Sequence, residues 1–186
     1  MKVNVGISNH HVHLTENDFK ILFGDSELTI RNWLNQPGQF ASNERVTIVG
    51  PKGNTQEMIV VGPFREYTQV EISKTDSYFL GINPPVRNSG DLKEASEVTI
   101  VGPKGQITRN CCIIANRHIH VNQNILKEKE LIGINEVAIK INGEKSGIIE
   151  HVVLKESQDA YFELHLDTDD ANAFLLNNGD KVEIII

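Results

Sequence analysis

The eight residues Val46–Gly53 read VTIVGPKG, and the same eight letters return at Val98–Gly105. In each copy a run of β-branched residues, typical of a strand, ends in Gly-Pro-Lys-Gly. Proline fits the first corner of a tight turn, and glycine can adopt the positive φ that such turns need. Glu57–Val61 follows the first copy and Gln106–Ile113 follows the second, and both again read as strands. The sequence therefore predicts two hairpins of like sequence, as in a duplicated β-unit.

A second pair of similar segments is Ser8–Leu14 (SNHHVHL) and Ala115–Val121 (ANRHIHV). Each follows an apolar strand, Val3–Ile7 or Cys111–Ala115, and each continues as His-apolar-His before a helix with a capping residue. Four helices are expected in all: Glu16–Phe23, a short one at Leu28–Leu34, Gln123–Leu131, and one that follows Thr168 and ends near Gly179.

The rest of the chain reads as strand and turn. Further strands are expected at Thr68–Ser73, Glu136–Asn142, His151–Lys155, Ala160–Asp167 and Lys181–Ile186. Helices this few and short cannot cover both faces of a large parallel sheet, whereas many short strands with glycine-rich turns are typical of small barrels. We therefore expect a mainly β fold, with two small β-barrel domains and short capping α-helices. The expected domains are residues 1–112 and 113–186, with an approximate boundary across which strands can be exchanged.

Composition excludes several classes of protein. The 186 residues carry 25 acidic and 18 basic side chains, a formal net charge of −7, which argues against nucleic-acid binding. Hydrophobic residues make up 39% of the chain, which excludes a disordered protein. No apolar run approaches the ~20 residues of a membrane-spanning helix. The two cysteines, Cys111 and Cys112, are adjacent and read as reduced core thiols of a cytoplasmic protein rather than as nucleophiles.

Four of the seven histidines form two His-x-His pairs. Residues i and i+2 of a strand point to the same face, so His11 projects with His13, and His118 projects with His120. Neutral imidazole is the commonest side-chain metal ligand, and two rings on one face fit a zinc ion. One such pair is more often a half-buried surface feature. Two pairs in matching contexts favour two metal sites.

A catalytic zinc ion normally takes three protein ligands and keeps one position open. His165 is the best candidate for one third ligand, because it lies on an alternating strand that runs into a helix. Glu71 is a weaker candidate for the other. It shares a strand face with Gln69 and Ser73, and periodicity alone favours a solvated side chain there.

Four other polar residues carry weaker signals. Arg65 and Ser89 lie on loops at strand ends, where an arginine fork and a hydroxyl can bind phosphate, although each taken alone reads as a solvated loop residue. His10 alternates to the face opposite His11, and His151 reads as an ordinary polar strand residue.

In these segments the chain resembles the PduL-type phosphate propanoyltransferases, a family of phosphate acyltransferases, almost from end to end. The segments that carry the resemblance are Ser8–His13, Gln36–Ala41, the two Gly-Pro-Lys-Gly turns, Thr68–Ser73, Pro85–Gly90, Arg117–His120 and His165–Asp169.

The resemblance implies two β-barrel domains with a dinuclear zinc site between them. Six residues match the family's zinc ligands, three for each ion: His11, His13 and Glu71 for one, and His118, His120 and His165 for the other. Arg65 matches the family's phosphate-handling arginine, and Ser89 matches a serine near the same site.

The implied activity is the reversible transfer of a propanoyl or acetyl group between coenzyme A and inorganic phosphate, giving acyl phosphate and free coenzyme A. Two zinc ions per chain are the expected cofactors, and a homodimer is the expected assembly. His10 stands where the family usually has arginine. Only seven residues precede Ser8, fewer than the targeting extension of members packaged in bacterial microcompartments, which favours a free cytoplasmic enzyme.

Two other functions fit the same residues. A dinuclear zinc hydrolase would use water in place of phosphate. A non-catalytic metal-binding module would surround each ion with four protein ligands. Three ligands per ion favour open, catalytic sites over the closed ones.

Overall fold

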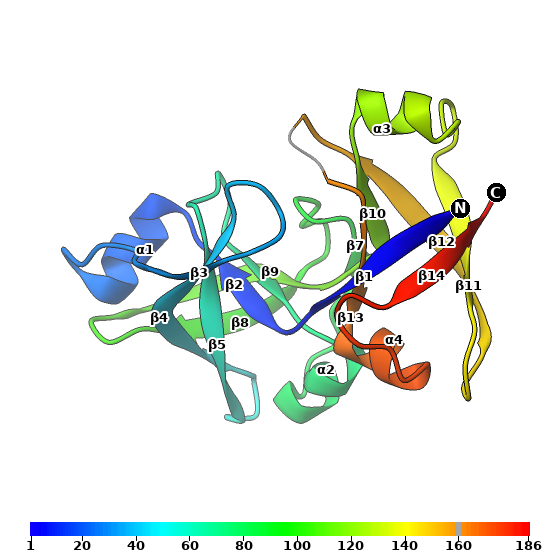
Figure 1. Ribbon diagram of the computed structural model, residues 1–186. Helices are drawn as coiled ribbons and strands as arrows, with labels where there is room; N and C mark the ends of the chain where they lie inside the picture. Colours follow the sequence, from blue (N-terminus) through cyan, green and yellow to red (C-terminus); the bar gives the residue numbers. More distant parts are fainter. Residues whose placement is uncertain (159–160) are drawn as a thin grey trace. The chain divides into compact units, whose positions relative to one another are not determined.

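The computed structural model describes residues 1–158 and 161–186, which form mainly strands with a few short helices (Figure 1). Contacts divide the chain into two compact units, His10–Ala115 and a second made of Met1–Asn9 with Asn116–Ile186. None of the helices in the described ranges is long and apolar enough to span a membrane.

The unit formed by His10–Ala115 is a six-stranded barrel. Its strands pair in the closed order β4-β5-β2-β6-β9-β8, and β8 returns to β4; β3 and β7 pair only at the outside, with β4 and β9. Its elements are β2 (His11–His13), α1 (Glu16–Phe23), β3 (Ile30–Trp33), β4 (Phe40–Val49), β5 (Thr55–Gly62), β6 (Gln69–Glu71), α2 (Lys74–Leu80), β7 (Val86–Arg87), β8 (Ser96–Val101) and β9 (Gln106–Ala115).

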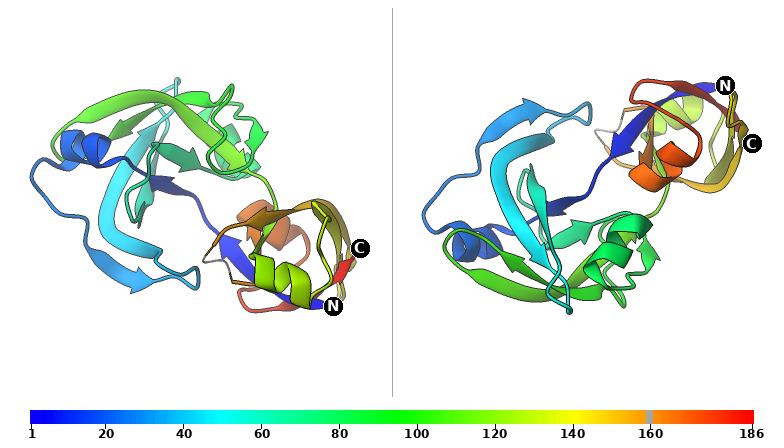
Figure 2. Two further views of the ribbon diagram at one scale, coloured as in Figure 1. Left: turned by 90° about the horizontal axis from the view of Figure 1, so that it is seen from above. Right: turned by 90° about the horizontal axis from the view of Figure 1, so that it is seen from below.

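The second unit is also a closed barrel of six strands, in the order β1-β13-β10-β12-β11-β14. In Figure 2 the strands of each unit curve around that unit's own interior. Its elements are β1 (Lys2–Ser8), β10 (His118–Val121), α3 (Gln123–Glu128), β11 (Glu136–Ile141), β12 (Gly147–Glu156), β13 (Glu163–Asp167), α4 (Thr168–Ala173) and β14 (Lys181–Ile185).

Each barrel encloses its own apolar core. The first core includes Phe19 and Ile48, and the second includes Ile119 and Ile139, all of them 0–1% exposed. Removing this apolar surface from water is the main favourable term in folding. The mainly β fold with two small barrels is therefore confirmed.

The division of the chain differs from the expected domains 1–112 and 113–186. The first nine residues belong to the same unit as the C-terminal segment, because β1 pairs in parallel with β13 and antiparallel with β14. The local sequence pattern does not show which strands pair when the segments are this distant in the chain. The boundary near the end of β9 falls at Asn116.

Two expectations for local structure are wrong. The segment expected to form a helix at Leu28–Leu34 contains β3, which is exposed along its length and forms a hairpin with β4. Its β-branched and aromatic residues suit a strand. Helix α2 was not expected, although Ser73 and Asp76 form a capping box at its start.

Several boundaries also differ. Helices α3 and α4 end at Glu128 and Ala173, before the expected ends, because Glu130 and Leu175 adopt left-handed backbone conformations with φ of 58° and 54°. Strand β13 begins at Glu163. Ala160, the expected first residue of that strand, lies outside the described residues.

The repeated octapeptides lie side by side in the first barrel. Strands β4 and β8 pair antiparallel with Ile48 opposite Ile100, so the two copies are related by a local two-fold axis. Each Gly-Pro turn meets the end of a helix: a Cβ at Gly50 would lie 1.9 Å from the carbonyl oxygen of Leu80, and one at Gly102 would lie 2.5 Å from that of Leu22. The repeat therefore supplies matching contacts for α2 and α1.

We expect Gly50→Ala to lower the free energy of unfolding by about 3 kcal/mol, because the added methyl group meets backbone rather than a movable side chain. Chemical denaturation of the variant and the wild type measures the difference. Pro51→Ala, in the same turn but exposed, is the control and should cost less than about 1 kcal/mol. Equal stability of Gly50→Ala and the wild type would contradict the close approach of α2.

Candidate metal centres

The first ligand cluster lies in the barrel of His10–Ala115, where β2 pairs antiparallel with β6. This pairing places Glu71 directly opposite His11, so that the carboxylate joins the two rings of the His-x-His pair. The Nε2 atoms of His11 and His13 are 3.2 Å apart, and the Glu71 oxygens lie 3.7 Å from His11 Nε2 and 3.8 Å from His13 Nε2. Glu71 is only 8% exposed, so the solvated position that periodicity favours is wrong.

Burial keeps the His13 ring neutral. The ring is 4% exposed, and this burial, together with the neighbouring His11, lowers the pKa of His13 to about 3. Its Nδ1 lies 3.1 Å from the carbonyl oxygen of Val61, which can only accept a hydrogen bond. Nδ1 therefore carries the proton of the neutral ring, and Nε2 presents a lone pair toward His11 and Glu71.

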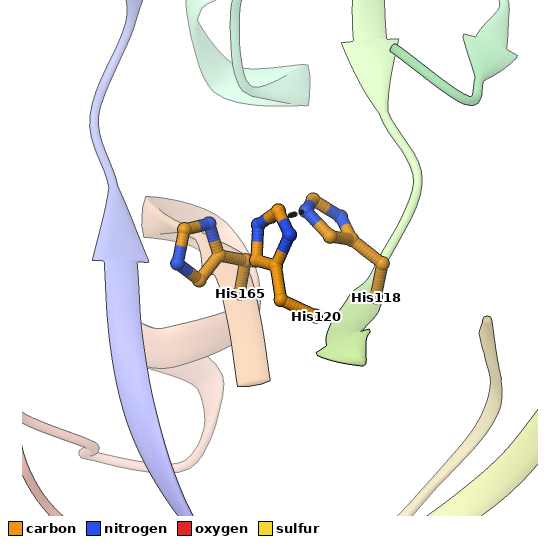
Figure 3. Close-up of side chains that lie close together, drawn as sticks. All are labelled: His118, His120 and His165. Atoms are coloured by element: carbon orange, nitrogen blue, oxygen red, sulfur yellow. Dashed lines mark hydrogen bonds between the residues drawn. The ribbon is translucent and has the colours of Figure 1, made fainter. Parts of the chain in front are cut away.

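The second ligand cluster lies in the other barrel and repeats this geometry. Strands β10 and β13 pair antiparallel with His165 directly opposite His118, and the Nε2 atoms of His118 and His120 are 3.2 Å apart. Figure 3 shows the three rings gathered together, with the His165 nitrogen next to the ring's attachment carbon, Nδ1, turned toward His120. His118 Nδ1 lies 2.8 Å from the carbonyl oxygen of Asn116, which again leaves the lone pair on Nε2.

Both clusters have the dimensions of a zinc site. A tetrahedral ion with bonds of about 2.05 Å holds its ligand atoms roughly 3.3 Å apart, close to the 3.2 Å between the paired nitrogens. In each cluster the three ligand atoms lie within 4.8 Å of one another. Three nitrogen or oxygen ligands suit a zinc ion that keeps a position open. The six residues expected as ligands are thus brought together in two groups of three.

Arg65 lies in the loop between β5 and β6 and is held from several sides. Its backbone N–H donates to Leu14 at 2.9 Å, and its Nη2 donates to Gln39 Oε1 at 2.8 Å. Nη1 lies 3.4 Å from the hydroxyl of Tyr67. The buried Nε makes no hydrogen bond to any described residue. The backbone contact with Leu14, the residue after His13, places Arg65 near the first cluster, and its positive charge contributes to the lowered pKa of His13.

Ser89 is hydrogen-bonded to strand β6 of the same barrel. Its Oγ accepts a hydrogen bond of 3.0 Å from Gln69 Nε2, and the N–H of Gly90 donates to Gln69 Oε1 at 2.8 Å. Ser89 and Arg65 are both half-buried and hydrogen-bonded, so neither is the solvated loop residue that it would be if read alone.

The other two histidines lie outside the clusters. His10 contacts Asp76 at 3.3 Å and Gln56 at 2.9 Å. Burial opposes ionisation of Asp76, but the hydrogen bonds from His10, Gln56 and the Ser73 N–H outweigh it and lower the Asp76 pKa to about 2. His151 is exposed and pairs with Glu136 at 3.1 Å, in keeping with an ordinary polar strand residue.

The cysteines are part of the first core. Cys111 and Cys112 are 2% and 0% exposed, which confirms that they pack in the interior. Burial raises the pKa of Cys111 to about 12 and also raises the pKa of Cys112. A buried thiol with a raised pKa is a poor nucleophile.

Two polar residues beside the second cluster were not expected. Glu163 is 6% exposed and lies 3.1 Å from His165 Nε2, and the Tyr161 hydroxyl lies 2.8 Å from the same nitrogen and donates to Glu163. Burial and the hydrogen bond to Glu163 raise the pKa of Tyr161. Glu163 is two residues before His165 on an alternating strand, so the period of two was a signal for it.

Comparison with known proteins agrees with this geometry. The sequence profile of the family described as phosphate propanoyltransferase matches residues 4–177. A phosphate propanoyltransferase of Thermotoga maritima is 46% identical over 97% of this chain and 88% of the relative. One of Rhodopseudomonas palustris is 41% identical over 98% and 82%, and one of Priestia megaterium is 46% identical over 96% and 83%.

The profile spans both barrels and includes all six clustered residues together with Arg65 and Ser89. Relatives at this identity and coverage share the whole of the two-barrel chain rather than one motif. The chain therefore belongs to the phosphate propanoyltransferase family and is an acyltransferase.

Proposed function

We propose that this acyltransferase moves a propanoyl or acetyl group reversibly between coenzyme A and inorganic phosphate, with one zinc ion in each ligand cluster. The names of the relatives support phosphate and a propanoyl group as substrates. The three-ligand clusters support open metal positions.

The observation that carries this proposal is the guanidinium beside the first cluster. Arg65 is fixed by Gln39 and Leu14, yet its buried Nε has no hydrogen-bond partner among the described residues. A buried donor without a partner is costly, and the guanidinium of the half-buried Arg65 can bind an oxyanion through its fork. Phosphate is an oxyanion that can accept from the arginine fork while another of its oxygens remains available for reaction.

Metal chemistry would complement this donor. The ligands would be His11, His13 and Glu71 in one barrel, and His118, His120 and His165 in the other. A zinc ion bound in such a site supplies a Lewis acid for oxygen atoms that carry negative charge.

The chain's own residues would bind and orient the substrates. Arg65 would hold phosphate, and Ser89, whose oxygen accepts from Gln69, would donate its hydroxyl proton to a substrate oxygen. In the transfer a phosphate oxygen forms a bond to the thioester carbonyl carbon, the carbon–sulfur bond breaks, and coenzyme A leaves as thiolate. Holding the two reactants together can contribute ~7–11 kcal/mol. Both cysteines are buried, so the scheme uses no acyl-enzyme formed on a cysteine.

We expect release of free thiol from propanoyl-CoA to require both phosphate and metal. The measurement uses purified protein with and without phosphate, before and after chelation, followed by readdition of zinc. Release without phosphate would favour a metal-dependent thioesterase or hydrolase instead. No release from zinc-loaded protein, with either propanoyl-CoA or acetyl-CoA, would contradict the proposed transfer of these groups to phosphate and favour a metal-binding module.

We expect His11→Ala and His118→Ala each to reduce bound zinc from two ions per chain to one and to abolish thiol release, because each removes one of three ligands from a cluster. Elemental analysis of the purified variants measures the zinc. His151→Ala, which removes an exposed histidine outside both clusters, is the control and should keep both ions and full activity. Two ions and wild-type activity in either cluster variant would overturn the ligand assignment.

We expect Arg65→Ala to keep both zinc ions and to lower kcat/KM for phosphate by about 10²–10³-fold, the usual effect of removing a donor from a developing or bound anion. The kcat/KM of Arg65→Lys for phosphate should lie between those of Arg65→Ala and the wild type, because lysine keeps the charge but loses the fork that contacts Gln39. Arg45→Ala, which breaks an exposed ion pair with Glu57, is the matched control. Kinetics of Arg65→Ala that equal those of the wild type would exclude the phosphate role.

A further inference from the structure

In each barrel the residue two positions before the third ligand contacts that ligand. Gln69 precedes Glu71 on β6, and its Nε2 donates to Glu71 Oε1 at 2.5 Å. Glu163 precedes His165 on β13, and its Oε2 lies 3.1 Å from His165 Nε2. Since residues i and i+2 share a strand face, both neighbours lie on the same side as the ligand that they contact.

The orientation of the Gln69 amide follows from its partners. The backbone N–H of Gly90 can only donate, so the amide oxygen must face it at 2.8 Å. The two amide hydrogens are then directed to Glu71 and Ser89. Gln69 is 0% exposed, so water does not compete for these bonds.

The contact in the second barrel has the opposite polarity. His165 Nε2 faces Glu163, while Nδ1 is the nitrogen turned toward His120 (Figure 3). The carboxylate accepts a hydrogen bond, so it favours the tautomer with the proton on Nε2 and the lone pair on Nδ1. The Tyr161 hydroxyl donates to the same carboxylate and holds it in place.

The backbone leaves room for this carboxylate at Gly6. A Cβ at that position would lie 2.6 Å from Glu163 Oε2 and 3.2 Å from His165 Cδ2. Glycine on β1 therefore permits Glu163 to reach His165. The residue that limits this contact comes from the opposite end of the chain.

We propose that Gln69 and Glu163 are positioning residues that orient the third metal ligand of each cluster, with a chemistry matched to that ligand. A carboxylate ligand receives a hydrogen-bond donor, and an imidazole ligand receives an acceptor. This inference rests on the proposed metal binding at the two clusters but not on the identity of the substrates. Residues that orient a metal ligand contribute to affinity as well as to activity.

The test measures zinc affinity of each cluster by competition with a chromophoric chelator, in the absence of substrate. We expect Gln69→Glu to weaken one of the two sites by about 10- to 100-fold and Glu163→Gln to weaken the other by a similar factor. Each variant should leave the second site unchanged. Gln106→Glu and Glu150→Gln repeat the two exchanges at exposed strand positions and should leave both sites unchanged.

Gly6→Ala is a further variant that substitutes none of the six ligands and neither positioning residue. Its methyl group displaces the end of the Glu163 side chain, so we expect it to weaken only the site of His118, His120 and His165. Asn4→Ala, an exposed position on the same strand, is its control. For the first barrel, Gln69→Met keeps the length of the side chain without an added charge and should weaken the other site.

A role in packing alone gives a different result. The melting temperature of the metal-free chain would then fall, while the zinc affinity of the folded variant would remain that of the wild type. Wild-type affinity at both sites in Glu163→Gln and Gly6→Ala, or in Gln69→Glu and Gln69→Met, overturns the proposal for that barrel. Failure of the wild-type chain to bind zinc would instead contradict the proposed function, and with it this inference.

Discussion

Antiparallel pairing between two short strands in each barrel determines where the third ligand lies. In one barrel the register of β2 with β6 puts Glu71 opposite His11, and in the other the register of β10 with β13 puts His165 opposite His118. A shift of one residue would turn every side chain of the strand to the other face. The ligand geometry therefore depends on the backbone hydrogen bonds that close the barrels, and on the apolar cores that hold those strands in register.

Burial of these polar side chains costs free energy unless they find partners. His13 and Glu71 in the first cluster are 4% and 8% exposed, and His120 in the second is 2% exposed, so both clusters place polar groups out of water. Hydrogen bonds such as that of His13 with Val61 offset part of this cost. A metal ion would offset more, because binding to the folded chain alone stabilises the folded state. Metal affinity and stability are thus expected to change together when a ligand is altered.

The parts of the site that follow from local periodicity could be predicted from the sequence. The spacing of two residues places His11 with His13 and His118 with His120 on any strand. Glu71 could not be predicted in this way, because its burial depends on its pairing with β2, more than fifty residues earlier. The pairing of β1 with β13 and β14 is likewise non-local, so the local sequence pattern does not assign β1 to the second barrel. The resemblance to the family identified Glu71 as a candidate ligand, because the ligand positions of a family reflect its folded structure rather than the local sequence pattern.

The two clusters differ in the charge that surrounds a divalent ion. Glu71 adds a negative charge at the first cluster, but the nearby Arg65 restores a positive one. Three neutral rings form the second cluster, with the carboxylate of Glu163 beside His165. With a divalent ion bound in each, these groups leave about two positive charges at the first cluster and one at the second. A multiply charged oxyanion should therefore be attracted more strongly to the first cluster. That is also the barrel that holds the guanidinium of Arg65, whose buried Nε makes no hydrogen bond to any described residue.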